Sequence, residues 1–369
     1  MTALTRLRLT DFRNYAGLDL KLDTRHVCLF GPNGAGKTNL LEAISQLGPG
    51  RGLRAAALNE LKREGCEAGW TVSADLDDRR IGVGLDESNG GAKRVVRLDG
   101  AAAKSGDLAE LIRIVWLTPA MDGVFRGASG DRRRFFDRQV MTFRPSHGQS
   151  ASRYEKAMRE RNALLERPSP DPAWADAIEA RMAESGAELA VNRAEILGRL
   201  SEAIDGRPDG VFPKADLALD GLAESAAVAG RRHGDIAALL ADGWRTSRRR
   251  DAAAGRTLDG PHRTDLIVYH RPSGSEAKNA STGQQKALLI GLILAAGTAL
   301  LADTDAPRPI LLLDEAAAHL DPDRRAALFD ELDALGGQAW LTGTERFLFE
   351  SFGDRAQRVE VNEGEALIA

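Results

Sequence analysis

The stretch that decides the fold is Gly31-Pro32-Asn33-Gly34-Ala35-Gly36-Lys37-Thr38, which fits the pattern G-x-x-x-x-G-K-[ST]. It follows the apolar run 27–30 and precedes a helical pattern over 39–44. In that strand–loop–helix context the pattern binds nucleotide phosphates. The glycines let backbone N–H groups face phosphate oxygens, and the helix N-terminus adds partial positive charge. The sequence therefore predicts a nucleotide bound along this loop, with Lys37 at the β- and γ-phosphates and Thr38 on Mg²⁺.

An acidic pair near the other end of the chain supplies the second half of such a site. Asp314 and Glu315 follow the continuously apolar run 310–313, which is typical of a parallel strand buried on both faces. Open α/β sheets bind ligands at the carboxyl ends of their strands. We expect Asp314 to hold Mg²⁺ and Glu315 to orient or deprotonate the attacking water. An ordinary strand end would carry the same residues, so the hydrolytic interpretation depends on the phosphate loop.

A third motif lies between these two. The segment Ser281-Thr282-Gly283-Gln284-Gln285-Lys286 precedes a long apolar stretch and resembles the signature of the ABC-type ATPases. That resemblance implies that Ser281, Gly283 and Gln284 contact the γ-phosphate of ATP bound to a second copy of the chain. It therefore implies a homodimer that forms with ATP. The alternative is a Ser/Gly helix cap without any ligand.

Two further segments bear on that resemblance. The run His319-Leu320-Asp321 resembles the D-loop, which crosses the dimer interface in ABC-type ATPases. The apolar run 339–341 ends where transport ATPases carry a switch histidine, and this chain has Thr342 and Thr344 there. A histidine switch is therefore not expected.

Five other segments narrow the resemblance to the RecF family of bacterial recombination and gap-repair ATPases. They are Thr10-Asp11-Phe12-Arg13-Asn14-Tyr15, Gly50-Arg51-Gly52-Leu53-Arg54, Leu117-Thr118-Pro119, Arg132-Arg133-Arg134-Phe135-Phe136-Asp137 and Gly260-Pro261-His262-Arg263-Thr264-Asp265-Leu266. The resemblance implies an α/β fold: an ABC/SMC-type P-loop ATPase head, a mixed sheet with flanking helices, carrying an inserted, mainly helical lobe. It implies ATP and Mg²⁺ as cofactors, and Arg13 and Asn14 as nucleotide contacts. After its Pro119, where the family usually has an acid, this chain has Ala120, with Asp122 nearby.

The same resemblance implies a function. We expect a weak DNA-dependent ATPase that acts as an ATP-dependent clamp in recombinational repair and replication restart. It would bind single-stranded gaps and duplex junctions, and it would help to load RecA together with RecR and RecO.

Bulk properties are consistent with an ordinary globular protein. The chain has 369 residues, 43% hydrophobic and 28% charged, with a net charge of -4. The N-terminus has no signal-peptide pattern, and the two cysteines, Cys28 and Cys66, give no disulfide framework, so we expect a cytoplasmic protein. The apolar segment from Ala287 to Ala302 is interrupted by Gly291, Gly297 and Thr298 and is interpreted as a buried helix, not a membrane span.

Three arginine clusters are candidates for backbone contacts with DNA. They are Arg132–Arg134, then Arg51 with Arg54, and finally Arg245, Arg248, Arg249 and Arg250 beside Trp244. A solvated protein face is the alternative for each of them.

The chain divides into predicted parts by its patterns. We expect a discontinuous ATPase head from 1–140 and 255–369, with a β-meander lobe at about 69–100, whose last turn is Asn89-Gly90-Gly91. We expect an inserted helical lobe at 141–254, broken by the proline-rich run 167–172.

Two rival classes share parts of this pattern. A transporter's cytoplasmic motor has the loop, the signature and the acidic strand, but it also has the switch histidine. A nucleotide-binding module that never hydrolyses would not need Glu315. Stimulation of ATPase activity by DNA would distinguish the DNA clamp from a transporter motor. Release of phosphate would distinguish it from a module that never hydrolyses ATP.

Overall fold

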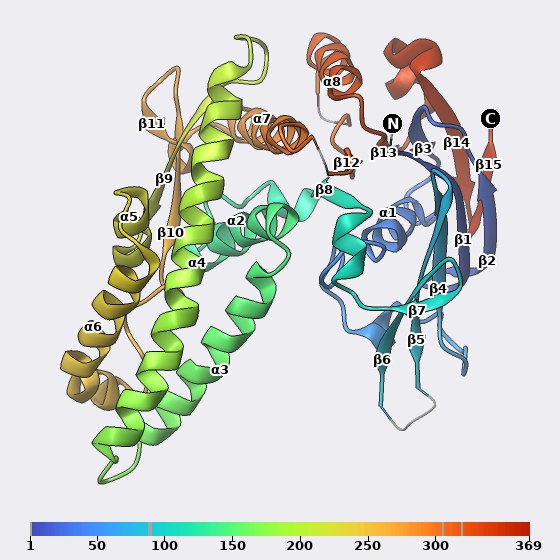
Figure 1. Ribbon diagram of the computed structural model, residues 1–369. Coiled ribbons are helices and arrows are strands. Elements are labelled where there is room, and N and C mark those ends of the chain that lie inside the picture. The colour runs from blue at the N-terminus through green and yellow to red at the C-terminus, as the bar shows by residue number, and fades with distance from the viewer. Residues whose placement is uncertain (1, 88–90, 305, 319) are drawn as a thin grey trace. The chain divides into compact units, whose positions relative to one another are not determined.

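The computed structural model describes residues 2–87, 91–304, 306–318 and 320–369, which fold into two compact units (Figure 1). The first unit comprises the chain up to Met121, the short stretch Gly210–Phe212, and Leu289–Ala369. The second comprises Asp122–Asp209 and Pro213–Leu288.

A mixed sheet forms the centre of the first unit. Its strand order is β15-β14-β3-β13-β12-β8, and all neighbours are parallel except β14 and β15. Every residue of β3, β12 and β13 is buried, as expected for parallel strands covered on both faces. The strands are β3 (His26–Phe30), β8 (Arg113–Leu117), β12 (Pro309–Leu313), β13 (Ala339–Gly343), β14 (Ala356–Asn362) and β15 (Glu365–Ile368). The helices α1 (Lys37–Ser45) and α8 (Pro322–Leu335) follow β3 and β12 in the chain.

A second, antiparallel sheet completes the first unit, in the order β2-β1-β4-β5-β6-β7. Three of its strands, β4, β5 and β6, form an antiparallel meander in the region predicted at about 69–100, and they continue the sheet begun by β1 and β2 instead of forming a separate one. The predicted turn at Asn89-Gly90 lies outside the described residues. The strands are β1 (Leu4–Phe12), β2 (Tyr15–Lys21), β4 (Thr71–Leu76), β5 (Arg79–Asp86), β6 (Lys93–Leu98) and β7 (Ala101–Ala103).

The second unit is mainly helical. The proline-rich break separates α3 (His147–Leu165) from α4 (Pro172–Gly206), where Asp171 caps the N-terminus of α4 through two backbone N–H groups. Apolar residues of α4, among them Ile178, Met182 and Leu189, are buried in a cluster with residues of α3, α5 and α6. The remaining elements are α2 (Ser129–Phe143), α5 (Leu222–Val228), α6 (His233–Ala254), and the antiparallel strands β9 (Ala215–Asp220), β10 (Asp265–His270) and β11 (Ser275–Glu276).

One helix, α7 (Thr282–Leu301), begins in the second unit and ends in the first. It is long and apolar enough to cross a membrane, but 83% of its most apolar window is buried inside the protein. A buried core helix meets the same criterion of length and composition. The short 3-10 helices are η1 (Leu58–Leu61), η2 (Asp107–Glu110), η3 (Pro119–Met121), η4 (Ala277–Asn279) and η5 (Arg346–Arg355).

The compact units divide the chain at different points from the predicted domains. Residues 122–140 and 255–288 belong to the helical unit. A bidentate ion pair between Arg132 on α2 and Asp265 on β10, with one N–O distance of 2.8 Å, helps to hold these two segments together. The assignment of 1–140 and 255–369 to one ATPase head stays a prediction about functional domains.

Candidate functional site

The phosphate loop leaves β3 and enters α1 with its backbone donors free of side-chain caps. Gly36 precedes α1 at a φ of 113°, and its side-chain-free backbone gives α1 no cap hydrogen bond. A Cβ on Gly36 would lie 2.5 Å from Asn14 Nδ2 and 2.7 Å from Tyr15 Oη, so only glycine fits there. The first-turn N–H groups of α1 are consequently available to an anion, together with the positive end of the helix dipole.

The Lys37 ammonium lies over this loop. Its Nζ donates to the carbonyl oxygens of Gly31 at 2.7 Å and Pro32 at 2.8 Å. Burial lowers the pKa of Lys37, while the charges of Glu315 and Asp314 oppose that shift. The Lys37 side chain is therefore bonded to the loop and interacts electrostatically with the two carboxylates.

Thr38 and Asp314 meet although 276 positions separate them in the sequence. Thr38 Oγ1 donates to Asp314 at 2.9 Å and 3.1 Å from the two carboxylate oxygens. Burial raises the pKa of Asp314, and hydrogen bonds from Thr342 and Thr38 oppose the rise. A hydroxyl and a carboxylate are hard oxygen donors of the kind that Mg²⁺ prefers, so these two residues fit a magnesium site.

Glu315 stands next to this pair in an unusual backbone conformation. Its φ is 52°, in the left-handed region that non-glycine residues rarely adopt. Its N–H donates to Thr342 Oγ1 at 2.8 Å. The residue leaves the buried strand here and its side chain is partly exposed, as a group that acts on water must be.

The predicted nucleotide contacts Arg13 and Asn14 brace the loop in this structure. Asn14 Nδ2 donates to Ala35 O at 3.2 Å, and the neighbouring Tyr15 hydroxyl donates to Gly36 O at 3.1 Å. Arg13 makes a bidentate ion pair with the fully buried Glu42 of α1, at 2.8 and 2.9 Å. Their contact with nucleotide stays a prediction.

Glu42 also accepts a hydrogen bond from a second arginine, Arg54, which belongs to one of the clusters considered as candidates for DNA contact. Arg54 Nη1 lies 2.7 Å from Glu42 Oε2 and 2.8 Å from Asn39 Oδ1. Arg54 therefore stabilises α1 behind the phosphate loop. Spacing alone could not reveal Glu42, because glutamate is almost never fully buried unless it is paired.

The signature segment lies in the second unit and forms the start of α7. Ser281 and Gln284 exchange hydrogen bonds: Ser281 N–H donates to Gln284 Oε1 at 3.0 Å, and Gln284 N–H donates to Ser281 Oγ at 3.3 Å. This is a capping box, so the alternative of a helix cap is realised. Ser281 and Gly283 are nevertheless exposed, and a Cβ built on Gly283 would meet no described atom within 4 Å apart from its chain neighbours and the backbone of its own helix. The segment is therefore open to a partner.

Two other positions singled out by the resemblance have these surroundings: the one that follows Pro119, and the D-loop candidate. Asp122 lies 3.5 Å from Lys286 of α7, whereas Ala120 is exposed. In the D-loop candidate, Asp321 caps α8 by accepting from the N–H of Arg324, and His319 lies outside the described residues.

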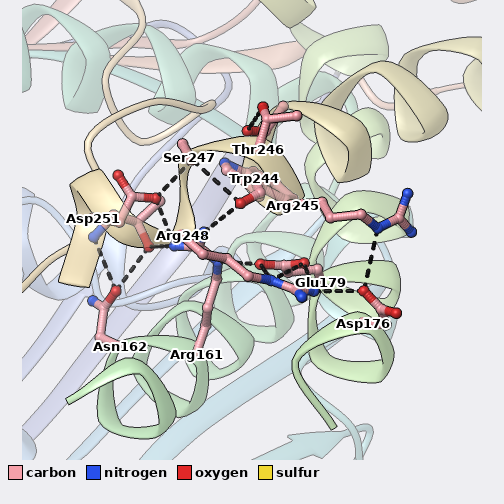
Figure 2. Close-up of polar contacts among 12 residues, drawn as sticks. Arg161, Asn162, Asp176, Glu179, Trp244, Arg245, Thr246, Ser247, Arg248 and Asp251 are labelled. Atoms are coloured by element: carbon pink, nitrogen blue, oxygen red, sulfur yellow. Dashed lines mark hydrogen bonds and ion pairs between the residues drawn. The ribbon is translucent and has the colours of Figure 1, made fainter. Parts of the chain in front are cut away.

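Most of the large arginine cluster on α6 is neutralised within the helical unit (Figure 2). Arg248 lies 3.1 Å from Glu179, and Arg245 lies 3.3 Å from Asp176. Arg250 pairs with Asp259. Beneath them the fully buried Arg161 bonds Glu179 at 2.9 Å and Asp251 at 2.8 Å (Figure 2). The interpretation of this cluster as a DNA surface is thereby weakened, because its charges are already paired.

The fold and the site together define the class. A phosphate loop follows β3, the acidic pair follows β12, and a single strand, β13, lies between these strands in the sheet. A helical unit carries a capped Ser-x-Gly-Gln segment. This is an ABC/SMC-type P-loop ATPase head with an inserted, mainly helical lobe.

Comparisons with known proteins then give the family. The model of the family described as RecF/RecN/SMC N terminal domain matches residues 3–365. The DNA replication and repair protein RecF of Rhizobium meliloti (strain 1021) is 52% identical over 369 residues, covering 98% of this chain and 97% of the relative. The chain belongs to the RecF family, within the ATP-binding ATPases of SMC type.

Two solved structures share the fold. The structure of the recombination mediator protein RecF with ATP in the RecFOR pathway has a TM-score of 0.85 at 22% identity, covering 100% of this chain and 98% of that one. The Smc head domain with an extended coiled coil from Pyrococcus furiosus, bound to the C-terminal domain of ScpA, has a TM-score of 0.54 at 14% identity, covering 100% and 96%. Both likenesses agree with the ABC/SMC-type ATPase head that the sequence resemblance implied.

Proposed function

We propose that this protein is an ATP-gated DNA clamp of recombinational repair, whose slow hydrolysis releases the clamp. The observation that carries the proposal is the meeting of Thr38 with Asp314, at 2.9 Å, with Glu315 adjacent. Segments from the two ends of the chain thereby assemble a site with a phosphate loop, a magnesium-type oxygen pair and a carboxylate that can act on water.

The chain's own residues have distinct roles in this proposal. The loop Gly31–Thr38 binds the phosphates, and Lys37 neutralises charge on the β- and γ-phosphates. Thr38 and Asp314 hold Mg²⁺, which neutralises further phosphate charge when it is bound. Glu315 orients the attacking water and accepts its proton. Ser281, Gly283 and Gln284 of one copy complete the site of the other, so that the dimer forms only while the γ-phosphate is present.

The DNA-related part of the proposal is supported by the names of the relatives, which are DNA replication and repair proteins. We infer that this chain acts in the cytoplasm on single-stranded gaps and duplex junctions, and that it helps to load RecA with RecR and RecO. A solved relative of the same fold is described as a recombination mediator of the RecFOR pathway, which agrees with that role.

Two arginines of the helical unit are the best candidates for contact with the DNA backbone. The first candidate is Arg133, which is bonded only to Thr264 O at 3.2 Å within the described part of the chain. Its neighbours Arg132 and Arg134 are paired with Asp265 and Asp131. The second candidate is Arg263, which is exposed and has no carboxylate partner among the described residues. Burial, and then the charges of Arg193, Arg134 and Arg263, lower the pKa of Arg133, with Asp137 opposing. A phosphate would relieve that repulsion.

The experiment that tests the proposal is fluorescence anisotropy of a gapped duplex titrated with the protein, with and without Mg-ATP. Strong binding is expected only with Mg-ATP. Lys37→Ala should abolish this dependence, because the loop loses its phosphate-binding cation, while Lys104→Ala, at an exposed lysine, should leave it unchanged. Binding indifferent to ATP in the unsubstituted protein would contradict the clamp and favour a transporter motor or a structural module.

A further inference from the structure

Thr342 is a fully buried residue at the end of β13, and neither the phosphate loop nor the acidic pair includes it. Its hydroxyl donates to Asp314 Oδ1 at 2.8 Å and accepts from the backbone N–H of Glu315 at 2.8 Å. One hydroxyl therefore bonds both of the acidic residues that end β12. The sequence drew attention to this position only because a histidine was missing there.

The sheet explains why Thr342 lies at this point. β12 and β13 are parallel neighbours with Leu313 paired to Leu341, so Asp314 and Thr342 leave the paired strands side by side. β13 also pairs with β3, placing Thr342 opposite Leu29, two residues before the phosphate loop begins. The threonine thus stands on the strand between the loop and the acidic pair.

Each of its two hydrogen bonds fixes a different feature of the site. Asp314 Oδ1 accepts from Thr342 and also from Thr38 at 2.9 Å, so two hydroxyls set the orientation of this carboxylate. The bond to the Glu315 N–H holds that residue in its left-handed conformation, at a φ of 52°. Because the backbone conformation directs the side chain, this bond also determines where the Glu315 carboxylate points.

We infer that Thr342 is a positioning residue that couples the orientation of Asp314 to that of Glu315. The inference rests on the proposed hydrolytic function. A shift of the Asp314 carboxylate on nucleotide binding pulls on the Thr342 hydroxyl, and through it on the Glu315 backbone. Thr342 thereby aligns the water-activating carboxylate with the occupied phosphate site.

The alternative is a hydroxyl that only satisfies buried polar groups of the fold. In that case its loss would lower stability without changing the turnover of the molecules that remain folded. Turnover and nucleotide affinity therefore distinguish the two possibilities, because loss of a positioning residue lowers turnover and leaves nucleotide affinity unchanged.

The test compares Thr342→Val, which keeps the shape and removes the hydroxyl, with Thr342→Ser, which keeps the hydroxyl. We expect Thr342→Val to lower kcat for Mg-ATP about 10- to 100-fold, as small misplacements of a catalytic group do, with the affinity for a fluorescent ATP analogue unchanged. Thr342→Ser should restore most of the turnover. Thr298→Val serves as the matched control, because the Thr298 hydroxyl bonds Leu294 O within α7.

A second readout does not depend on turnover. Thr342→Val should accumulate an ATP-bound dimer in sedimentation, because nucleotide binds and is not cleaved. If Thr342→Val does not fold, Thr342→Cys, which keeps the volume with a poor donor and acceptor, must show the same loss of kcat.

Unchanged kcat in folded Thr342→Val or Thr342→Cys would overturn the inference, as would a parallel loss of affinity that serine does not restore. Failure of the proposed hydrolytic function would give a different result from failure of the inference about Thr342. In that case the unsubstituted protein itself would neither hydrolyse Mg-ATP nor bind the analogue.

Discussion

His26 is a buried histidine at the start of β3, the strand that leads into the phosphate loop. Its Nδ1 accepts from the N–H of Ala339 at 3.0 Å, so this ring nitrogen is unprotonated in the fold. Burial lowers the pKa of His26, with Asp333 opposing and Arg355 reinforcing the shift. The folded protein therefore favours the neutral imidazole, whereas the unfolded chain takes up the proton at the ordinary pKa of about 6.5.

This shift predicts a loss of stability in mild acid. As the pH falls below about 6.5, the unfolded chain binds the proton first, so the free energy of unfolding decreases by at most about 1.4 kcal/mol per pH unit until the folded pKa is reached. His26→Asn can offer an oxygen in place of Nδ1 and should reduce this slope in urea unfolding between pH 7.5 and 5.5, leaving the part that comes from His262, whose pKa burial also lowers. His233→Asn, at a half-exposed histidine, should keep it. An unchanged slope in His26→Asn would assign the acid sensitivity to another group.

At the scale of single elements, the start of α7 carries two roles in one segment. Ser281 caps the helix through Gln284, and it is also the group proposed to reach the ATP of a second copy. Ser281→Arg should block ATP-dependent dimerisation while leaving nucleotide binding intact, since the bulk and charge lie on an exposed surface. Sedimentation with ATP and binding of a fluorescent ATP analogue measure the two quantities.

Ser281→Thr is the control for this prediction, because it keeps a capping hydroxyl and should dimerise normally. A collapse of nucleotide affinity in Ser281→Arg would instead show that the segment is needed for the fold. Gly283→Ala adds a second check, since in the isolated chain the Cβ meets no described atom within 4 Å apart from its chain neighbours and the backbone of its own helix.

The ion network between α3, α4 and α6 is the second feature at this scale (Figure 2). Arg161 is fully buried and bonds Glu179 and Asp251 as well as Thr257 Oγ1 at 2.9 Å. Arg161→Met removes the buried cation that Glu179 and Asp251 share, and only Glu179 keeps a second close arginine, Arg248, so the helical unit should be destabilised by about 3–5 kcal/mol. Urea unfolding followed by tryptophan fluorescence measures the loss.

Arg245→Met is the matched control, because Arg245 belongs to the same network but is half exposed. The urea unfolding transition of Arg245→Met should be nearly unchanged. Equal effects of the two substitutions would mean that burial of the Arg161 pairs does not decide the stability of the unit.

For the whole molecule, the central prediction concerns assembly. Glu315→Gln keeps the size of the side chain and removes the base, so an ATP-bound dimer should accumulate in sedimentation with Mg-ATP. Lys37→Ala should stay monomeric under the same conditions, because the γ-phosphate is no longer bound. A monomer in both variants would contradict a site completed by two copies.

The sequence by itself determined the class of the fold and the identity of the central site. A phosphate loop, an apolar strand with two acids, and the alternation of the meander are local patterns, and each can be recognised within a short stretch of sequence. Asp314 and Thr38 could be paired in advance because parallel strands bring their carboxyl ends to one edge of a sheet.

The tertiary structure alone decided which charged and polar groups have partners. Arg54, one of the candidates for DNA contact, bonds the buried Glu42, and the arginines of α6 are mostly paired with Asp176, Glu179 and Asp259. It also placed Thr342 against Asp314 and Glu315. The physical reason is that a hydrogen bond or ion pair depends on the approach of side chains far apart in the sequence, to within about 3 Å, and residue spacing carries no information about that approach.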